Sequence, residues 1–112
     1  MEAKLLMIGD WVENTEFGNG QGKYGRVEII EATRVWLDNG KCYTPISCLR
    51  PIELTEEIMK KNAVSCVTWV KTGSGVVIEI DGLLSHWRGL APYVHNLQHA
   101  YRLNGIDKEV EL

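Results

Sequence analysis

The sequence contains no long apolar run and only three cysteines, and both features exclude classes of protein. No apolar run approaches the roughly 18 residues that a membrane-spanning helix needs, so no membrane location is predicted. Cys42, Cys48 and Cys66 are an odd number, and the N-terminal segment lacks the apolar stretch and cleavage site of a secretory signal. We therefore predict free thiols and a cytoplasmic location.

An excess of basic residues is also missing. Twelve Lys and Arg stand against fifteen Asp and Glu, which gives a net charge of −3. Proteins that bind nucleic acid through electrostatics usually carry a basic footprint, so the net charge argues against a general nucleic-acid binder. The 112 residues, 45% of them hydrophobic and 24% charged, are typical of a soluble protein with one modest core.

Residues 1–54 have the pattern of a β-rich half. The β-like runs cover residues 10–13, 26–32, 34–37 and 41–44. Asp38-Asn39-Gly40 between the last two runs predicts a hairpin with a type I′ turn. In the second run the apolar–polar alternation slips at Ile29 and Ile30. Residues 46–50, which lie between two prolines, favour a short edge strand or a single helical turn.

Residues 55–112 predict a β-hairpin with two helices. The elements are a helix at 55–62 with Thr55 as its N-cap, strands at 64–71 and 76–81, a third strand at 83–87, and a helix at 92–104. Within the second strand, Val76, Ile78 and Ile80 fall on one face. The tail at 109–112 alternates, which is compatible with a final strand or a frayed end.

The longest predicted helix carries signals at both ends. Proline at its first position and Gly105 just past its end form the expected asymmetric pair, and Ile106 suits a Schellman-type ending. Five side chains gather on one side of the helical wheel and are expected to form its core face: Tyr93, Val94, Leu97, Ala100 and Tyr101.

The same helix places His95 and His99 four residues apart, a spacing that can chelate one metal ion. The motif supplies no third ligand, and no glutamate follows His95 as a metalloprotease motif requires. Two ordinary surface histidines are the favoured interpretation. No cofactor, metal or catalytic residue is therefore predicted.

Residues 82–106 contain no Asp or Glu but hold two arginines and all three histidines. On the helical wheel His95, His99 and Arg102 form one stripe roughly opposite the core face. This predicts a locally cationic surface, which would suit an acidic protein partner or a phosphate, while a solvated helix face is the alternative. The candidate binding residues are Trp87, Arg88, His95, His99 and Arg102.

The four tryptophans are Trp11, Trp36, Trp69 and Trp87, and each lies in a β-like run, where core packing is the commoner use of the side chain. Exposed aromatic side chains beside basic ones can also stack on single-stranded nucleic acid. Trp11, Lys23 and Arg26 are the candidates for such a site.

Three stretches of the sequence together resemble those of a known group of proteins. They are LMIGDWV at residues 6–12, LRPIELTEEI at residues 49–58, and YVHNLQHA at residues 93–100 followed by Gly105 and Ile106. In these stretches the chain resembles a group of small uncharacterised proteins from Bacteroides-type bacteria and their prophages or mobile elements. The resemblance implies a bacterial cytoplasmic protein of phage-like origin, and it implies no activity.

A second resemblance covers residues 8–52. Its motifs are Gly9-Asp10-x-Val12, Gly25-x-Val27, Val35-x-Leu37 and Ile46-x-x-Leu49. They are similar to those of small SH3-like barrels of the KOW or Tudor kind, which bind nucleic acid or peptides between strand loops. The six basic and eight acidic residues of this half weaken the nucleic-acid version.

We therefore predict an α+β fold with an SH3-like β-barrel half at 1–54 and an α+β half at 55–112, packed together as a single compact unit. The favoured function is a non-enzymatic interaction or accessory protein of phage or mobile-element origin. The alternative is a weak nucleic-acid-binding module. The least favoured hypothesis is a metal-dependent enzyme that uses His95 and His99. The identity of the partner and the oligomeric state stay open.

Overall fold

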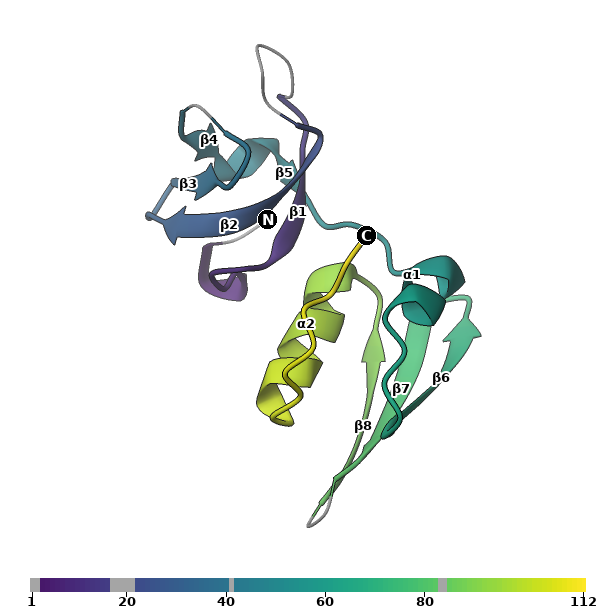
Figure 1. Cartoon of the computed structure of the whole chain (residues 1–112). Coiled ribbons are helices and arrows are strands. Elements are labelled where there is room, and N and C mark those ends of the chain that lie inside the picture. The colour runs from purple at the N-terminus through teal and green to yellow at the C-terminus, as the bar shows by residue number, and fades with distance from the viewer. Residues whose placement is uncertain (1–2, 17–21, 41, 83–84) are drawn as a thin grey trace. The chain divides into compact units, whose positions relative to one another are not determined.

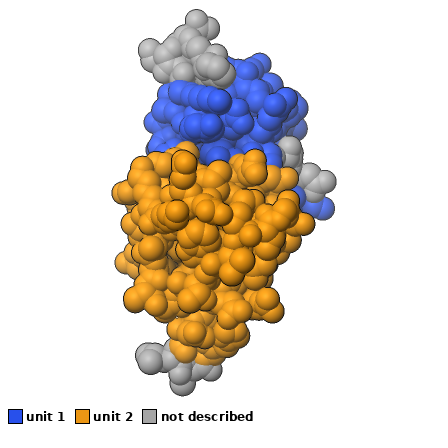
Figure 2. Space-filling view, turned by 90° about the vertical axis from the view of Figure 1, so that its right-hand side faces the viewer, with its two compact units in different colours: residues 1–52 blue, residues 53–112 orange. Residues whose placement is uncertain are grey.

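The structure is a computed structural model that describes residues 3–16, 22–40, 42–82 and 85–112. The chain divides into two compact units, Met1–Ile52 and Glu53–Leu112, which Figure 2 shows in separate colours. Antiparallel sheets and two α-helices make it a mixed α+β protein, which confirms the predicted fold class at that level. That the two halves pack as one unit stays a prediction.

The first unit is built on a five-stranded sheet in the order β4-β3-β2-β1-β5, with antiparallel pairing throughout (Figure 1). Its strands are β1 (Trp11–Asn14), β2 (Tyr24–Ile30), β3 (Arg34–Leu37), β4 (Thr44–Pro45) and β5 (Leu49–Arg50). Two short 3-10 helices are η1 (Ala3–Leu5) and η2 (Ile46–Cys48). Both alternatives predicted for residues 46–50 are therefore present, since η2 leads directly into β5.

A tight turn before β1 begins the sheet. The backbone of Gly9 has a φ of 92°, which favours glycine. The Asp10 carboxylate accepts a hydrogen bond from the Met7 backbone N–H at 2.8 Å and closes the turn. Val27 then ties the turn to β2, because its carbonyl accepts from the Gly9 N–H and its own N–H donates to the Asp10 carbonyl.

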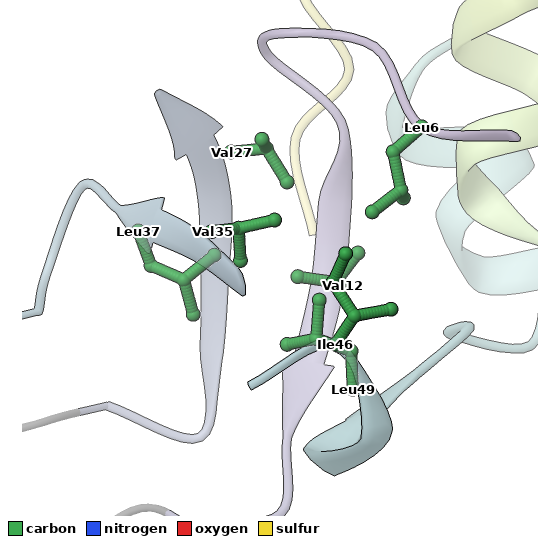
Figure 3. Close-up of a cluster of buried hydrophobic side chains, with 7 residues drawn as sticks. All are labelled: Leu6, Val12, Val27, Val35, Leu37, Ile46 and Leu49. Atoms are coloured by element: carbon green, nitrogen blue, oxygen red, sulfur yellow. The ribbon is translucent and has the colours of Figure 1, made fainter. Parts of the chain in front are cut away.

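The core of this unit is aliphatic. Figure 3 shows its seven buried side chains converging between the strands and η2: Leu6, Val12, Val27, Val35, Leu37, Ile46 and Leu49. A β-bulge in β2 shifts the register between Val27 and Ile29. The bulge accounts for the slip in the sequence pattern, since it leaves Ile29 exposed and turns Ile30 toward the core.

The predicted hairpin forms, but its loop is longer than a two-residue turn. β3 pairs with β4 through Val35 and Thr44. Of the strand predicted at 41–44, Thr44 belongs to β4, Cys42 and Tyr43 lie in the loop before it, and residue 41 lies outside the described residues. The physical reason lies in the turn side chains. Asp38 accepts a hydrogen bond from the Arg26 backbone N–H at 2.9 Å, and Asn39 donates to the Tyr24 carbonyl at 2.6 Å. Both side chains thus bind β2.

The second unit runs α1–β6–β7–β8–α2 (Figure 1). Its elements are α1 (Glu56–Lys61), β6 (Val67–Thr72), β7 (Gly75–Asp81), β8 (His86–Ala91) and α2 (Val94–Leu103), with strand order β6-β7-β8. The third strand predicted at 83–87 is present at its last two residues and continues to Ala91, while residues 83 and 84 lie outside the described residues. The tail at 109–112 is not a strand; it is held by hydrogen bonds between Glu111 and the buried Asn62.

The start of α1 and the end of α2 have the predicted capping interactions. The Thr55 hydroxyl accepts a hydrogen bond from the Ile58 backbone N–H, which confirms the N-cap of α1. At the end of α2, Gly105 has a φ of 69° and donates to the Arg102 carbonyl, while the Ile106 N–H donates to the Tyr101 carbonyl. These two bonds are the Schellman pattern that Gly105 and Ile106 predicted.

The start of α2 differs from the prediction. Glu53 and Tyr93 form an isolated antiparallel bridge, and Leu54 donates a hydrogen bond to the Pro92 carbonyl, so residues 92 and 93 stay extended. Tyr93 becomes the N-cap of a helix that begins at Val94. Its side chain is 39% exposed, so its assignment to the core face is wrong.

One face of the β6–β7–β8 sheet is buried. Val76, Ile78 and Ile80 of β7 are fully or almost fully buried, as the alternation predicted. The helices supply further buried side chains, among them Met59 and Leu97. The opposite face of the sheet is not covered in the same way, and it carries the site described next. None of the helices in the described parts of the chain has the length and apolar content to span a membrane.

Candidate functional site

The outward face of the β6–β7–β8 sheet carries a row of aliphatic side chains. Val70, Val77 and Leu90 are register partners across the three strands, so they form one line over the sheet. The side chains at the two ends of the line are the most open, with Val70 65% and Leu90 51% exposed. We call these three residues the aliphatic row. Burying such a row against a partner removes apolar surface from water, the main driving force of association.

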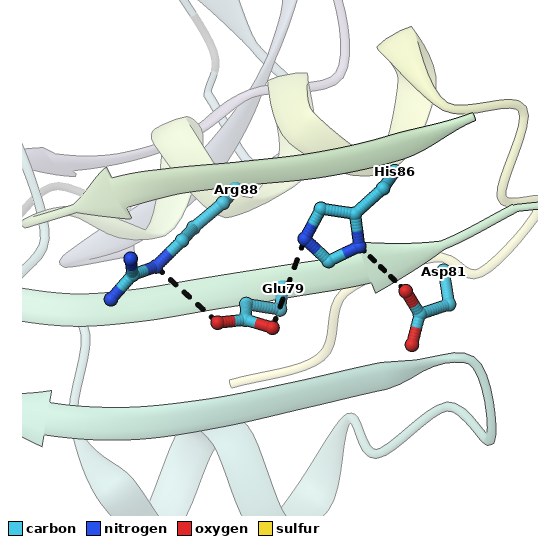
Figure 4. Close-up of polar contacts among 4 residues, drawn as sticks. All are labelled: Glu79, Asp81, His86 and Arg88. Carbon is cyan, nitrogen blue, oxygen red and sulfur yellow. Dashed lines mark hydrogen bonds and ion pairs between the residues drawn. The ribbon is translucent and has the colours of Figure 1, made fainter.

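Charged residues follow the aliphatic row on the same face of β7 and β8, because Glu79 and Arg88 pair two residues along from Val77 and Leu90. Figure 4 shows the contacts among these charged residues. Arg88 Nε lies 3.3 Å from Glu79 Oε1 on the neighbouring strand. His86 Nδ1 lies 2.6 Å from Asp81 Oδ1, and its Nε2 lies 3.8 Å from Glu79 Oε2. We call Glu79, Asp81, His86 and Arg88 the charged row. In Figure 4 all four side chains stand on one side of the sheet, and helical ribbon passes behind the strands on the other.

The charged row changes the electrostatics expected for this part of the chain. The stretch at 82–106 lacks acidic residues, but β7 brings Glu79 and Asp81 beside its Arg88 and His86. The row holds two carboxylates, one guanidinium and one imidazole, so it carries no net positive charge. The predicted cationic surface is therefore wrong at Arg88. The reason is strand pairing, which sequence distance does not reveal.

Trp87 and Arg88 do not share a surface. They are consecutive residues of β8, so their side chains point to opposite faces of the sheet. The half-buried Trp87 ring covers Gly89, where an added Cβ would lie 2.6 Å from the ring. Trp87 therefore belongs to the packing of the covered face, and the predicted pairing of these two residues in one site is wrong.

The predicted stripe on α2 is also broken. His95 is only 7% exposed, while His99 is half-buried and Arg102 is exposed. The His95 ring stacks on Tyr93, with centroids 5.8 Å apart, and meets the His99 ring edge-on at 5.6 Å. The helix buries a wider arc than its apolar residues alone outline, because His95 and Gln98 are buried as well. A solvated stripe through His95 is therefore wrong.

The structure shows no third metal ligand beside His95 and His99 within the described ranges. Among the residues that the structure describes, no group of three or more His, Cys, Asp or Glu side chains is arranged to hold a metal.

The candidate nucleic-acid residues do lie together in the first unit. The Arg26 guanidinium is 4.9 Å from the centre of a Trp11 ring, and the two residues are register partners on β1 and β2. Lys23 lies 5.4 Å from the centre of the adjacent Tyr24 ring. The Lys23 Nζ is also 3.8 Å from a carboxylate oxygen of Glu13, which reduces the positive charge of this surface.

All four tryptophans are half-buried. None of them belongs to the fully buried core, so the interpretation of these residues as core side chains is only partly right. Trp11 and Trp36 lie beside cationic or polar side chains of the first unit. Trp69 and Trp87 lie on the same face of the second sheet as Ile78 and Ile80.

A further cluster in the first unit was not predicted from the sequence. The Arg34 guanidinium lies 4.0 Å from the centre of the Tyr43 ring, and its Nε is 2.6 Å from Glu31 Oε1. The Trp36 ring meets Tyr43 edge-on, with centroids 5.2 Å apart. Arg34 and Trp36 are two residues apart on one strand, which the sequence pattern shows. Tyr43 joins them across the β3–β4 loop, whose length the Asn-Gly signal mispredicted.

Hydrogen bonding in this cluster shifts two pKa values. The hydrogen bond from Arg34, with a second from the Tyr43 side chain, holds the pKa of the Glu31 carboxyl below its ordinary value, although desolvation acts the other way. The same bond to Glu31 raises the pKa of Arg34. Both groups therefore stay ionised at neutral pH.

Comparison with known protein families, curated proteins and solved structures found no match for this chain.

Proposed function

We propose that the chain is a non-enzymatic interaction module that binds a protein partner through the exposed face of the β6–β7–β8 sheet. The observation that carries this proposal is the aliphatic row, Val70, Val77 and Leu90, which lies in register across all three strands with both end residues more than half exposed. Single exposed aliphatic side chains are normal on a protein surface, whereas contiguous exposed apolar patches mark interaction sites.

The charged row supports the choice of a protein partner. Glu79 and Asp81 supply two carboxylates against the one guanidinium of Arg88, so this face favours a partner segment that combines aliphatic side chains with a basic one. Charges that flank an apolar strip contribute to orientation and specificity more than to affinity. A polyanion would meet the two carboxylates, so this face does not suit nucleic acid.

The experiment places a photo-reactive phenylalanine analogue at position 70 or 90 of the full chain, with position 57 of α1 as an exposed control. After irradiation in extract of the source cells, positions 70 and 90 are expected to crosslink a common protein that position 57 does not. The V70K/L90K variant, checked for unchanged circular dichroism, should no longer bind it. Equal crosslinking from all three positions, or undiminished binding by the variant, would overturn the proposal.

A weak nucleic-acid-binding module is the second candidate, and it rests on a different surface. Trp11 and Arg26 are register partners on β1 and β2, and Lys23 directly precedes β2; two cation–aromatic contacts join these residues and Tyr24 in two pairs. Such contacts suit base stacking beside a phosphate backbone. A gel shift with a single-stranded oligonucleotide at low salt tests it. A shift that R26A weakens supports it, and the absence of any shift at low salt excludes it.

The remaining predictions stay proposals. The strand order β4-β3-β2-β1-β5, with η2 between β4 and β5, supports an SH3-like arrangement of the first unit, although no closed barrel is found among the described residues. Phage or mobile-element origin and a cytoplasmic location rest on the sequence alone. A metal-dependent enzyme that uses His95 and His99 is the least supported function.

A further inference from the structure

The side chain of Arg34 is held in place before any ligand binds. Its guanidinium stacks on the Tyr43 ring at 4.0 Å, and its Nε donates a hydrogen bond of 2.6 Å to the Glu31 carboxylate. Contacts to both the plane and one edge of the guanidinium limit its rotation. A free arginine side chain loses much conformational entropy when it binds, so an arginine fixed in advance binds at lower cost.

The fixed guanidinium retains its terminal donors. An arginine carries five N–H groups. Within the described ranges of the chain, the guanidinium of Arg34 makes one hydrogen bond, and it uses Nε. The two terminal nitrogens keep their N–H groups, and the side chain is about half exposed. Two parallel N–H groups at the end of a guanidinium match the two oxygens of a carboxylate.

An apolar surface continues from the guanidinium. The Trp36 ring meets the Tyr43 ring edge-on, and Ile29 is the register partner of Trp36 on β2. Ile29 is 45% exposed, because the bulge in β2 turns it outward. The surface made by Ile29, Arg34, Trp36 and Tyr43, which we call the Arg34 site, thus joins a fork of donors to aromatic and aliphatic side chains.

We propose that the Arg34 site binds a peptide segment of a partner protein through a Glu or Asp side chain, whose carboxylate takes two hydrogen bonds from the terminal nitrogens of Arg34, while a neighbouring apolar side chain of the segment packs on Trp36 and Ile29. The site lies wholly within the first unit. It therefore does not depend on the proposed binding face of the β6–β7–β8 sheet, and either proposal can fail without the other.

The surroundings favour a peptide carboxylate over a nucleic-acid phosphate. Glu31 is in direct contact with Arg34, and Glu28 is exposed on the strand beside Ile29. A nucleic acid carries a charge on every nucleotide and would bring further phosphates close to these carboxylates. A single ligand carboxylate brings only one negative charge near Glu31, and its apolar neighbour packs on uncharged side chains.

The test is a titration of the full chain, labelled with nitrogen-15, with the peptide acetyl-Phe-Glu-Leu-amide. The matched probe is acetyl-Phe-Gln-Leu-amide, which has the same shape without the charge. We expect saturable shifts of the Arg34 Nε–Hε and Trp36 indole N–H signals with the glutamate peptide, and at least about tenfold weaker binding of the glutamine peptide. Equal binding of the two peptides, or no shift at about 10 mM peptide, would overturn the proposal.

Two variants and one further probe make the test specific. R34K keeps the positive charge but loses the planar fork, so it should weaken binding of the glutamate peptide at least about fivefold. R50K changes an exposed arginine elsewhere in the sheet and should bind as the unchanged chain does. If R34K and R50K bind equally well, or a short oligothymidine strand shifts the same signals more strongly than the peptide, a peptide carboxylate is not the ligand.

Discussion

Asn62 and Glu111 are joined by a reciprocal pair of hydrogen bonds, although 49 residues separate them. The Asn62 side-chain amide donates to the Glu111 carbonyl at 2.7 Å, and the Glu111 N–H donates to Asn62 Oδ1 at 2.7 Å. The same amide donates to the Ile58 carbonyl, and the Tyr101 hydroxyl donates to the Asn62 carbonyl. One buried asparagine thus connects α1, α2 and the tail.

Replacing Asn62 by alanine is expected to lower the free energy of unfolding by about 2–4 kcal/mol, because it leaves the carbonyl and the N–H of Glu111 without their partner. Urea titration followed by circular dichroism measures the change. N62D is the more specific variant. Its carboxylate still accepts a hydrogen bond from the Glu111 N–H, but it no longer donates to the carbonyls of Ile58 and Glu111. The loss of unfolding free energy in N62D should be smaller in acid, where protonation of the carboxylate restores one donor. A deficit below about 0.5 kcal/mol for N62A would show that the network is not structural.

Gly75 occupies a position that has no room for a side chain. Its φ is 141°, and an added Cβ would lie 2.7 Å from Pro92 Cα and 3.0 Å from the Ala91 carbonyl oxygen. G75A is therefore expected to destabilise the protein by about 1–3 kcal/mol from backbone strain, with the clash in addition. Gly73, two residues earlier, has nothing within 4 Å of such a Cβ, so G73A is the matched control. Equal melting temperatures of the two variants would contradict this account of the turn.

Features set by neighbouring residues could be predicted from the sequence. Thr55 caps α1 through a residue three positions away, and Gly105 with Ile106 ends α2 through bonds to its last turn. The alternation in β7 correctly placed Val76, Ile78 and Ile80 on the buried face. In each case the interaction lies within a few residues, so the local pattern contains it.

Features set by distant residues could not be predicted. The bridge between Glu53 and Tyr93 delays the start of α2, and no local rule indicates it. The sequence predicted a cationic stretch around Arg88, but the pairing of β7 with β8 places Glu79 beside it. The Arg34 site depends on the length of the β3–β4 loop, which two side-chain contacts to β2 determine. Pairing register therefore limits what the sequence alone reveals about a surface site.

The Glu31–Arg34 contact predicts an acid-resistant carboxylate. Because the hydrogen bond from Arg34 lowers the pKa of Glu31, this side chain should stay ionised below the pH at which an ordinary glutamate is half protonated. Carbon-13 NMR of the side-chain carboxyl measures the midpoint. R34A should move the midpoint up toward the ordinary glutamate value, whereas R50A should leave it in place. An unchanged midpoint in R34A would mean that the contact does not persist in solution.

The buried Tyr101 predicts a loss of stability at high pH. Burial, with a smaller contribution from Cys66, raises the pKa of Tyr101 to about 12. The folded state therefore holds the phenol proton more tightly than the unfolded state, whose pKa is about 10. The resulting stabilisation is complete below about pH 10 and is lost as the pH rises through about 12.

Y101F isolates this effect, because phenylalanine fills the same space without an ionisable group. At neutral pH the variant should be less stable by about 1 kcal/mol, since it lacks the 3.1 Å hydrogen bond to the Asn62 carbonyl. Above pH 10 the unchanged chain should lose stability faster than Y101F, so the two free energies of unfolding should converge. Urea titrations at several pH values between about 7 and 12 measure the difference. A difference that stays constant over this range would mean that Tyr101 ionises as readily in the folded state as in the unfolded one, which burial of its hydroxyl against Asn62 does not allow.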